Sequence, residues 1–439
     1  MATTNSAAPA GATELRDRKP IPKADKYIWA IYILLLLVSV VELYSASSRE
    51  VQATNVFGPL LRHGRLLLIG VAITVGLSRV KYIWVYRCTL LFGALAVVLG
   101  IYVLFKGDII NGARRSTTIL GIPLQPSEIL KLAVVLFIAY IMSIKQTRKG
   151  VDTSAVIWSA GAVLLCGGLL FTQGLTNTLL LMGISFAMML VGGVPWSKFG
   201  IMLLIYLAAG GCFYAIKHSG NKISQAEETT ILETGRDASG NVTTLDRGNL
   251  QKGRIANWLG DSVPKYMKPI TSANRQEMYS YMAQAHGGIH GVLPGNSRET
   301  SRLPLAFSDY IFAIVVEDWG FIGGMGLLIL YLALLGRAGN IAAHCSRAFP
   351  ALLVLGMAIM IVLQALFHMA IVTGVFPVSG QPLPLISKGG SSIIVTSIAF
   401  GIMLSVSRYA VQSNNSREIN AEKLELPDEL AAENRGKLI

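Results

Sequence analysis

Apolar runs long enough to cross a lipid bilayer recur through most of this chain. A hydrocarbon core of about 30 Å takes roughly 20 helical residues to cross. Runs of that length lie near residues 27–47, 60–78, 83–105, 127–144, 154–172, 176–194, 199–217, 309–336, 350–373 and 391–408. Charged residues make up only 14% of the 439 positions, against roughly a quarter in soluble domains. The pattern predicts an all-α polytopic membrane protein with about ten transmembrane helices.

Lysines and arginines in the short connections predict the orientation, because basic residues beside membrane spans are retained in the cytoplasm. They precede the first span, from Arg16 to Lys26, and recur between spans two and three, four and five, six and seven, and eight and nine. All of these connections fall on one face of the bundle. We therefore expect a multi-pass protein of the cell inner (plasma) membrane with both termini in the cytoplasm. Much of the +13 net charge is then an orientation signal and an attraction to anionic lipids, so no nucleic-acid partner is expected.

Composition divides the chain into three parts. Residues 1–26 are rich in Ala, Thr and Ser and lack the apolar core of a cleavable signal, so we interpret them as a disordered cytoplasmic tail. Residues 27–408 form the membrane domain, and residues 409–439 form a second polar, cytoplasmic tail. A large extracytoplasmic loop at 218–308 separates the seventh and eighth spans and contains a polar insertion at 219–250.

Two adjacent arginines, Arg114 and Arg115, lie on the outer face, where the orientation rule predicts few basic residues. A guanidinium pair presents planar forks that suit bidentate binding of phosphate. On the outer leaflet, phosphate occurs mainly in lipid headgroups and lipid-linked diphosphates. The alternative is that both side chains only extend to the headgroup level.

Glu128 and Lys131 are three residues apart and share a face of the fourth span near its outer end. One interpretation is an intrahelical ion pair that follows a helix start at "QPSE", with Pro126 in the first turn and Ser127 or Gln125 as the cap. The other is that Lys131 faces a polar cavity shared with the arginines.

Three carboxylates mark the start of the eighth span. Asp309 opens it and is a candidate either for a reactive group or for an ordinary N-cap. Glu317 and Asp318 follow eight and nine residues later, roughly 12 to 14 Å deeper. A helix that only spans lipid would not carry all three. His286 and His290 precede this span, but glycines between them break a helix, so no metal site is predicted.

The last outer loop ends in "KGGSS", which brings Lys388, the hydroxyls of Ser391 and Ser392 and backbone N–H groups to the start of the tenth span. A glycine-rich helix start is suited to binding an anion. An ordinary serine-capped helix entry is the alternative.

Three motifs in this order resemble the shape, elongation, division and sporulation (SEDS) proteins, the FtsW and RodA group of peptidoglycan glycosyltransferases. They are "INGARR…LGIPLQPSEILKLA", "LP…SDYIFAIVVEDWGFIGG" and "FPVSGQPLPLISKGGSS". The resemblance covers about residues 27–408 and is closer to the FtsW type than to the RodA type. It implies polymerisation of lipid II, the undecaprenyl-diphosphate-linked disaccharide pentapeptide, with inversion at the MurNAc C1, in septal wall synthesis during cell division.

The resemblance also implies roles for the candidate residues. Asp309 matches the family's essential acid and would act as general base on the acceptor sugar hydroxyl. The implied diphosphate-binding residues are Arg114, Arg115, Lys131 and Lys388. The implied supporting residues are Glu128, which would orient Lys131, and Glu317, Ser391 and Ser392. A divalent cation, Mg or Mn, could assist departure of the diphosphate, although no cluster of metal-ligating residues in the sequence indicates a site for one.

The implied partners, besides lipid II, are a class B penicillin-binding protein, which is a transpeptidase, and other division proteins. Two departures from the family pattern are Ser116, where Trp is usual, and Lys388, where an aromatic residue is usual. Alternative functions are a lipid II flippase, a RodA-type elongation polymerase and a non-catalytic division scaffold. A flippase should show polar residues along a path through both leaflets, whereas here the ionisable residues gather at the outer face.

Overall fold

The computed structural model describes residues 23–46, 58–110, 113–119, 122–147, 150–171, 174–200, 274–303 and 306–410, with a few single positions between 202 and 270. The helices are α1 (Lys26–Ala46), α3 (Gly58–Ser78), α4 (Tyr82–Lys106), α5 (Pro126–Ile144), α6 (Thr153–Phe171), α7 (Leu175–Val191), α11 (Arg275–Gly287), α12 (Ile311–His344), α13 (Ala348–Val372) and α14 (Gly390–Tyr409). The strands are β1 (Asp108–Ile110), β2 (Ala113–Ile119), β3 (Ile122–Leu124), β4 (Gln146–Thr147) and β5 (Gly150–Val151).

The prediction of a polytopic helical membrane protein is confirmed. Within the described ranges, seven helices are long and apolar enough to cross a membrane, namely α1, α4, α5, α6, α12, α13 and α14. Shorter apolar helices occupy the second and sixth predicted spans, at His63–Ser78 and Leu175–Val191. The seventh predicted span, both predicted tails and the 219–250 insertion lie largely or wholly outside the described residues.

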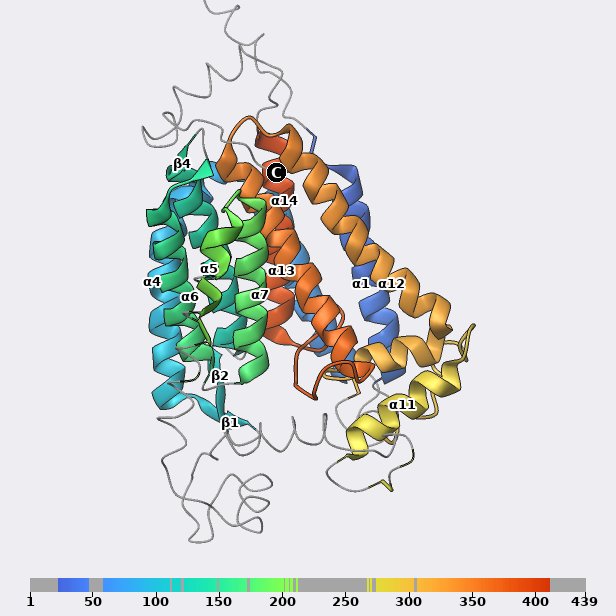
Figure 1. The fold of residues 1–439 in the computed structure, drawn as a ribbon. Helices are drawn as coiled ribbons and strands as arrows, with labels where there is room; N and C mark the ends of the chain where they lie inside the picture. Colours follow the sequence, from blue (N-terminus) through green and yellow to red (C-terminus); the bar gives the residue numbers. More distant parts are fainter. Residues whose placement is uncertain are drawn as a thin grey trace, which may run out of the picture.

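The bundle has two distinct ends. At one end, which we call the terminal end, the backbone N–H of Asp25 donates to Ser407 Oγ at 3.1 Å. There Arg337 Nε also donates to the Asp25 carboxylate at 2.9 Å. The two ends of the described chain therefore lie on the same side, as an even number of spans requires. Helix α11 and strands β1 and β2 lie at the opposite end, which we call the loop end (Figure 1).

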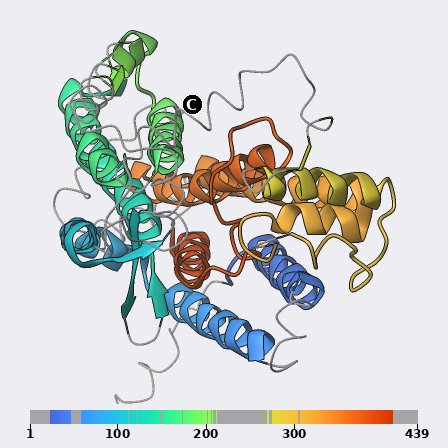
Figure 2. The ribbon, with the colours of Figure 1, turned by 90° about the horizontal axis from the view of Figure 1, so that it is seen from below.

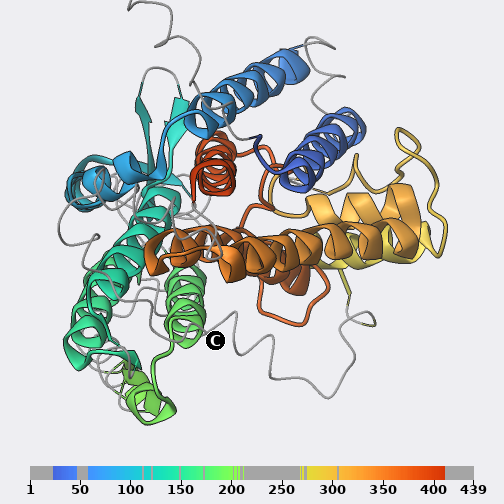
Figure 3. The same cartoon turned by 90° about the horizontal axis from the view of Figure 1, so that it is seen from above.

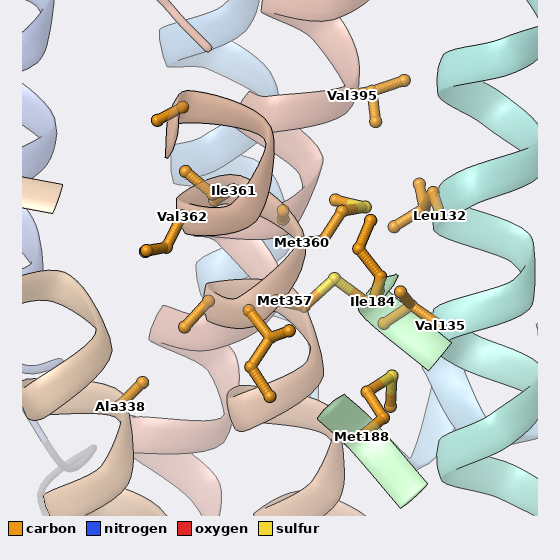
Figure 4. Packing of buried hydrophobic residues seen from close by; sticks show 14 of the residues in the cluster. Leu132, Val135, Ile184, Met188, Ala338, Met357, Met360, Ile361, Val362 and Val395 are labelled. Carbon is orange, nitrogen blue, oxygen red and sulfur yellow. The ribbon is translucent and has the colours of Figure 1, made fainter. Parts of the chain in front are cut away.

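The centre of the bundle is α13. Of its most apolar 18-residue stretch, 83% is buried, against 22% of the corresponding stretch of α4 at the periphery. It packs against α5, α7, α12 and α14. Figure 4 shows Met357 and Met360 of α13 facing Val135 and Ile184 from two of these helices. Figure 3 shows α14 near the middle of the molecule, where it packs on α3, α5 and α13. Short, flexible and branched apolar side chains fill the interior that α13 shares with its neighbours.

A small antiparallel sheet in the order β1-β2-β3 follows α4 at the loop end. Its register pairs Asp108 with Ser116 and Thr117 with Leu124. This sheet was not predicted from the sequence. Because the sheet packs on α4, α5 and α14, it holds the predicted arginine segment against the bundle.

Helix α12 is broken at Gly320, whose φ of +70° is non-helical. The segment 287–293 pairs with the broken turn: Leu293 N donates to Asp318 O at 2.8 Å, and Phe321 N donates to Gly288 O at 2.9 Å. These bonds replace helical ones, as a break in the ladder requires. A Cβ at Gly320 would lie 2.2 Å from Ile289 O, so only glycine fits. The ribbon changes direction there, beside α11 (Figure 1).

Candidate functional site

Asp309 lies at the loop end, in a turn that precedes α12, and its carboxylate faces the segment between α13 and α14. A Cβ built on Gly380 would lie only 2.9 Å from Asp309 Oδ2. The N-cap of α12 is Tyr310, with no side-chain cap bond, so the N-cap interpretation of Asp309 is wrong. The carboxylate is half-buried and lies against backbone from a different part of the chain.

The segment 378–389 carries Lys388 to the same place, and we call it the re-entrant loop. Two hydrogen bonds join it to the turn before α12: Lys388 N donates to Phe307 O at 2.9 Å, and Ser387 Oγ donates to Ser308 O at 2.7 Å. The Lys388 ammonium lies 4.3 Å from the centroid of the Phe307 ring, a cation–π contact. Asp309 and Lys388 are thus carried on two adjacent, bonded segments.

Side chains of α13 bind the backbone of the re-entrant loop. His368 Nδ1 lies 2.6 Å from Gln381 O, and Gln364 Nε2 donates to Pro382 O at 3.3 Å. Gln364 is eight residues from the end of α13, about 12 Å inward at 1.5 Å per residue. The loop therefore turns back into the bundle, where its carbonyls need protein donors because hydrocarbon supplies none.

Helix α12 supplies a third tether. The Tyr331 hydroxyl donates to Pro384 O at 2.6 Å, and its side chain is fully buried. The next residue, Leu385, has a φ of +65°, a left-handed conformation that costs a non-glycine residue free energy. Leu385 is itself fully buried, so burial and the neighbouring bonds hold it there.

Glu128 and Lys131 form the predicted ion pair and also reach the re-entrant loop through one intermediary. Lys131 Nζ lies 2.8 Å from Glu128 Oε1 and 2.8 Å from Gln364 Oε1, and its side chain has no exposed surface. Because Lys131 occupies the Gln364 carbonyl, the amide nitrogen of Gln364 is left to donate to Pro382 O. A direct contact of Lys131 with a diphosphate would require it to leave these partners, and that role stays a prediction.

Arg114 and Arg115 lie in β2, where Arg114 pairs with Ile109 of β1. Their side chains lie outside what the structure describes. The backbone places them at the loop end, on a strand that packs on α5. Their proposed contact with a diphosphate stays a prediction.

Glu317 joins α11 and the chain beyond it to α12. Its fully buried carboxylate accepts hydrogen bonds from Arg298 N at 2.9 Å, Glu299 N at 3.1 Å and the Ser297 hydroxyl. His286 Nδ1 of α11 lies 2.8 Å from the same carboxylate. Glu317 is therefore positioned as a structural support for the 286–299 segment, eight residues along the chain from Asp309.

Ser391 and Ser392 are buried in the first turn of α14. The N-cap is Gly389, with no side-chain cap bond, so the serine-capped helix entry is wrong. Among described residues, the Ser392 hydroxyl has no hydrogen-bond partner. Helix α5 likewise begins at Pro126 after Gln125, with no side-chain cap bond.

Gln364 and Tyr331 belong to this site but were not predicted from the sequence. A polar side chain inside an apolar span is a signal by default, and Gln364 carries that signal in the ninth span. Tyr331 carries none, because a tyrosine in a span is equally consistent with packing. Within the described ranges, no three His, Cys, Asp or Glu residues gather as metal ligands.

Comparison with known proteins gives consistent matches over most of the chain. A family model described as cell cycle protein, FtsW/RodA/SpoVE, matches residues 25–412. The "probable peptidoglycan glycosyltransferase FtsW" of Geobacter metallireducens is 28% identical over 397 residues, covering 89% of this chain and 96% of the relative. The "stage V sporulation protein E" of Bacillus subtilis is 29% identical over 398 residues, covering 88% and 97%.

Solved structures share the fold. A chain from a structure titled "Structural coordination of polymerization and crosslinking by a peptidoglycan synthase complex" superposes with a TM-score of 0.64 at 24% identity, covering 88% of this chain and 98% of that one. The rod shape determining protein RodA of Thermus thermophilus superposes with a TM-score of 0.59 at 22% identity, covering 88% and 98%.

Proposed function

The chain belongs to the FtsW, RodA and SpoVE family of cell cycle proteins, and from that premise we propose that it is a peptidoglycan glycosyltransferase. Its substrate is lipid II, which it polymerises into glycan strands with inversion at the MurNAc C1. The loop end faces the outside of the cytoplasmic membrane, and both termini are cytoplasmic. The relatives named as glycosyltransferases support the reaction class.

The observation that carries this proposal is the meeting of Asp309 with the re-entrant loop that bears Lys388. A carboxylate and an ammonium held on two bonded segments supply the two groups that glycosyl transfer from a diphosphate needs. One accepts a proton from the nucleophile, and the other stabilises the charge on the leaving group.

In the proposed reaction, the 4-hydroxyl oxygen of the acceptor sugar attacks C1 of the donor and forms the new glycosidic bond. Its proton passes to the Asp309 carboxylate. The bond between C1 and the diphosphate oxygen breaks, and the electron pair leaves with the diphosphate. Lys388 and the β2 arginines Arg114 and Arg115 stabilise that negative charge. Attack from the face opposite the leaving group inverts the configuration at C1.

Lys131 is, in this proposal, a positioning residue. It fixes Gln364, and Gln364 fixes the backbone of the re-entrant loop at Pro382. Glu128 neutralises Lys131 in the buried environment. The loop that carries Lys388 thereby rests on a buried polar cluster at the outer end of α5.

We further propose that the protein acts in septal wall synthesis together with a class B penicillin-binding protein. Relatives named FtsW support the division role. The structure whose title joins polymerisation to crosslinking supports a transpeptidase partner.

Purified protein incubated with lipid II tests the function. Wild type is expected to form glycan strands, resolved by gel electrophoresis, and Asp309→Ala is expected to form none while keeping the wild-type unfolding temperature. Asp152→Ala, which removes an exposed carboxylate beside β5 at the terminal end, serves as the control and should polymerise normally. Undiminished strands from Asp309→Ala would refute the proposal.

A further inference from the structure

An apolar groove of about 720 Å³ lies between α1 and α3. It is lined by residues 33–40 of α1 and 61–71 of α3, and Arg65 is the one charged residue among those lining it. The two helices lie side by side at the edge of the molecule (Figures 2 and 3). In a chain that spans the bilayer this edge meets hydrocarbon, so the groove suits a flexible apolar chain.

The groove lies in the half of the bundle that contains the candidate site. Helix α3 begins at the loop end, and the groove follows it from Leu61 to Val71. Ten residues of helix span about 15 Å, which is half of a hydrocarbon core of about 30 Å. A lipid chain in the groove would therefore belong to the leaflet nearest Asp309 and Lys388.

A hydrogen bond between the two helices separates the groove from the re-entrant loop. Ser39 Oγ of α1 lies 2.9 Å from His63 Nε2 of α3, and both side chains are buried. Ser39 Oγ also lies 3.5 Å from Ile386 O, two residues before Lys388 in the re-entrant loop. At this level of the bundle, the α1–α3 contact therefore has hydrocarbon on one side and the backbone of the re-entrant loop on the other.

We propose that the groove between α1 and α3 binds the polyprenyl chain of the lipid-linked diphosphate sugar, an inference that rests on the proposed function. With the chain in the groove, the diphosphate lies at the loop end within the region of Lys388. Arg65, which lines the groove and is exposed, provides a second cation for it, since a long basic side chain extends readily to the headgroup level.

Gly64 gives a direct test, because it lines the groove and a Cβ there meets nothing within 4 Å. Gly64→Leu fills the groove without a backbone clash. Gly76→Leu is the matched control, on the same helix, with equally open space and no place in the groove. KM is measured for lipid II with its undecaprenyl chain and for an analogue with the same headgroup and a dimethylallyl chain, a single isoprene unit that is too short to fill the groove.

In Gly64→Leu we expect KM for the undecaprenyl substrate to rise about tenfold, which corresponds to roughly two methylene groups losing their burial. KM for the dimethylallyl analogue should stay unchanged, and Gly76→Leu should leave both values unchanged. An equal rise for both substrates, or no rise for either, would overturn the groove assignment. If the groove assignment fails in this way, polymerisation of lipid II by wild type and by Gly76→Leu would still support the proposed function.

Photo-crosslinking tests binding without any turnover. Undecaprenyl diphosphate with a diazirine in its chain should label peptides covering 33–40 and 61–71 in wild type and Gly76→Leu, and should not label them in Gly64→Leu. A phosphatidylglycerol with a diazirine in its acyl chain is the comparison. Equal labelling by that phospholipid would show a general lipid contact and would overturn the assignment to the substrate.

Discussion

Two segments at the loop end are held in place by different means. Besides its backbone bonds to the break in α12, the 286–299 segment is held by one side chain of that helix, Glu317. The Glu317 carboxylate accepts bonds from the Ser297 hydroxyl and two backbone N–H groups and contacts His286. The re-entrant loop depends on several side chains, each of which contacts one carbonyl. A single charged hub concentrates the side-chain stabilisation in one residue, whereas separate neutral contacts distribute it over several. The re-entrant loop should therefore keep its position when one of these contacts is lost. The 286–299 segment should loosen when Glu317 is lost.

The distributed arrangement has one weak point, the buried ion pair behind Gln364. Lys131→Met leaves the Glu128 carboxylate buried without its cation, which typically costs about 3–5 kcal/mol. We expect the unfolding temperature in detergent to fall by more than in any other variant described below, with loss of glycan synthesis. Thermal unfolding followed by intrinsic fluorescence measures the first effect.

The double variant Lys131→Met with Glu128→Gln sharpens this comparison. Removing both charges should restore most of the stability, because no buried charge remains unpaired. If Lys131 acts only by positioning the re-entrant loop through Gln364, KM for lipid II should recover together with stability, provided that Gln364 still bonds Pro382 O. Recovered stability with KM still raised at least tenfold would instead assign Lys131 to the diphosphate.

The hub of the 286–299 segment gives the next largest effect. Glu317→Ala removes an acceptor of several hydrogen bonds, some from buried amides, and should destabilise the protein by about 3 kcal/mol. Hydrogen exchange should rise selectively across 286–299. Glu277→Ala is the control: it removes a half-buried carboxylate of α11 that accepts a hydrogen bond from the Tyr281 hydroxyl, and it should change exchange across 286–299 little. Equal exchange in both variants would contradict the single-hub account.

The smallest effect is expected from one contact of the distributed set. Tyr331→Phe removes the hydroxyl that donates to Pro384 O and leaves the ring in place, so the loss should be about 1 kcal/mol. Glycan synthesis should fall less than threefold. A complete loss of synthesis at unchanged stability would mean that this carbonyl alone controls the loop.

Local patterns in the sequence identified the membrane spans well, because hydropathy over about 20 residues depends on no distant partner. The start of α12 at Ile311 lies two residues from the predicted start at 309. The break at Gly320 could not be predicted, since it depends on the 287–293 segment packing into it. The strands of the β1-β2-β3 sheet contain only three or seven residues, too few for a clear alternation of apolar and polar side chains.

The residues of the candidate site divide in the same way, into those that a local pattern can indicate and those that depend on a distant partner. Charged residues such as Asp309 and Lys388 stand out in an apolar chain, so their chemistry can be inferred from type and position. Their supports cannot, because the partner of Gln364 is a carbonyl 18 residues away that only the turn of the re-entrant loop brings close. The capping alternatives for Asp309 and the serines failed because loop geometry, which residue type does not determine, placed other residues at the N-caps.

Disulfide trapping tests the central claim, that Asp309 and the re-entrant loop form one site. In a background without native cysteines, Asp309→Cys is combined with Gly380→Cys, and Asp309→Cys with Gly374→Cys is the control. The account predicts that mild oxidation crosslinks the first pair rapidly, as seen by mass spectrometry of proteolytic fragments, because a Cβ at residue 380 lies 3.4 Å from the Asp309 carboxyl carbon. No disulfide in that pair, or equal crosslinking in the control, would contradict it.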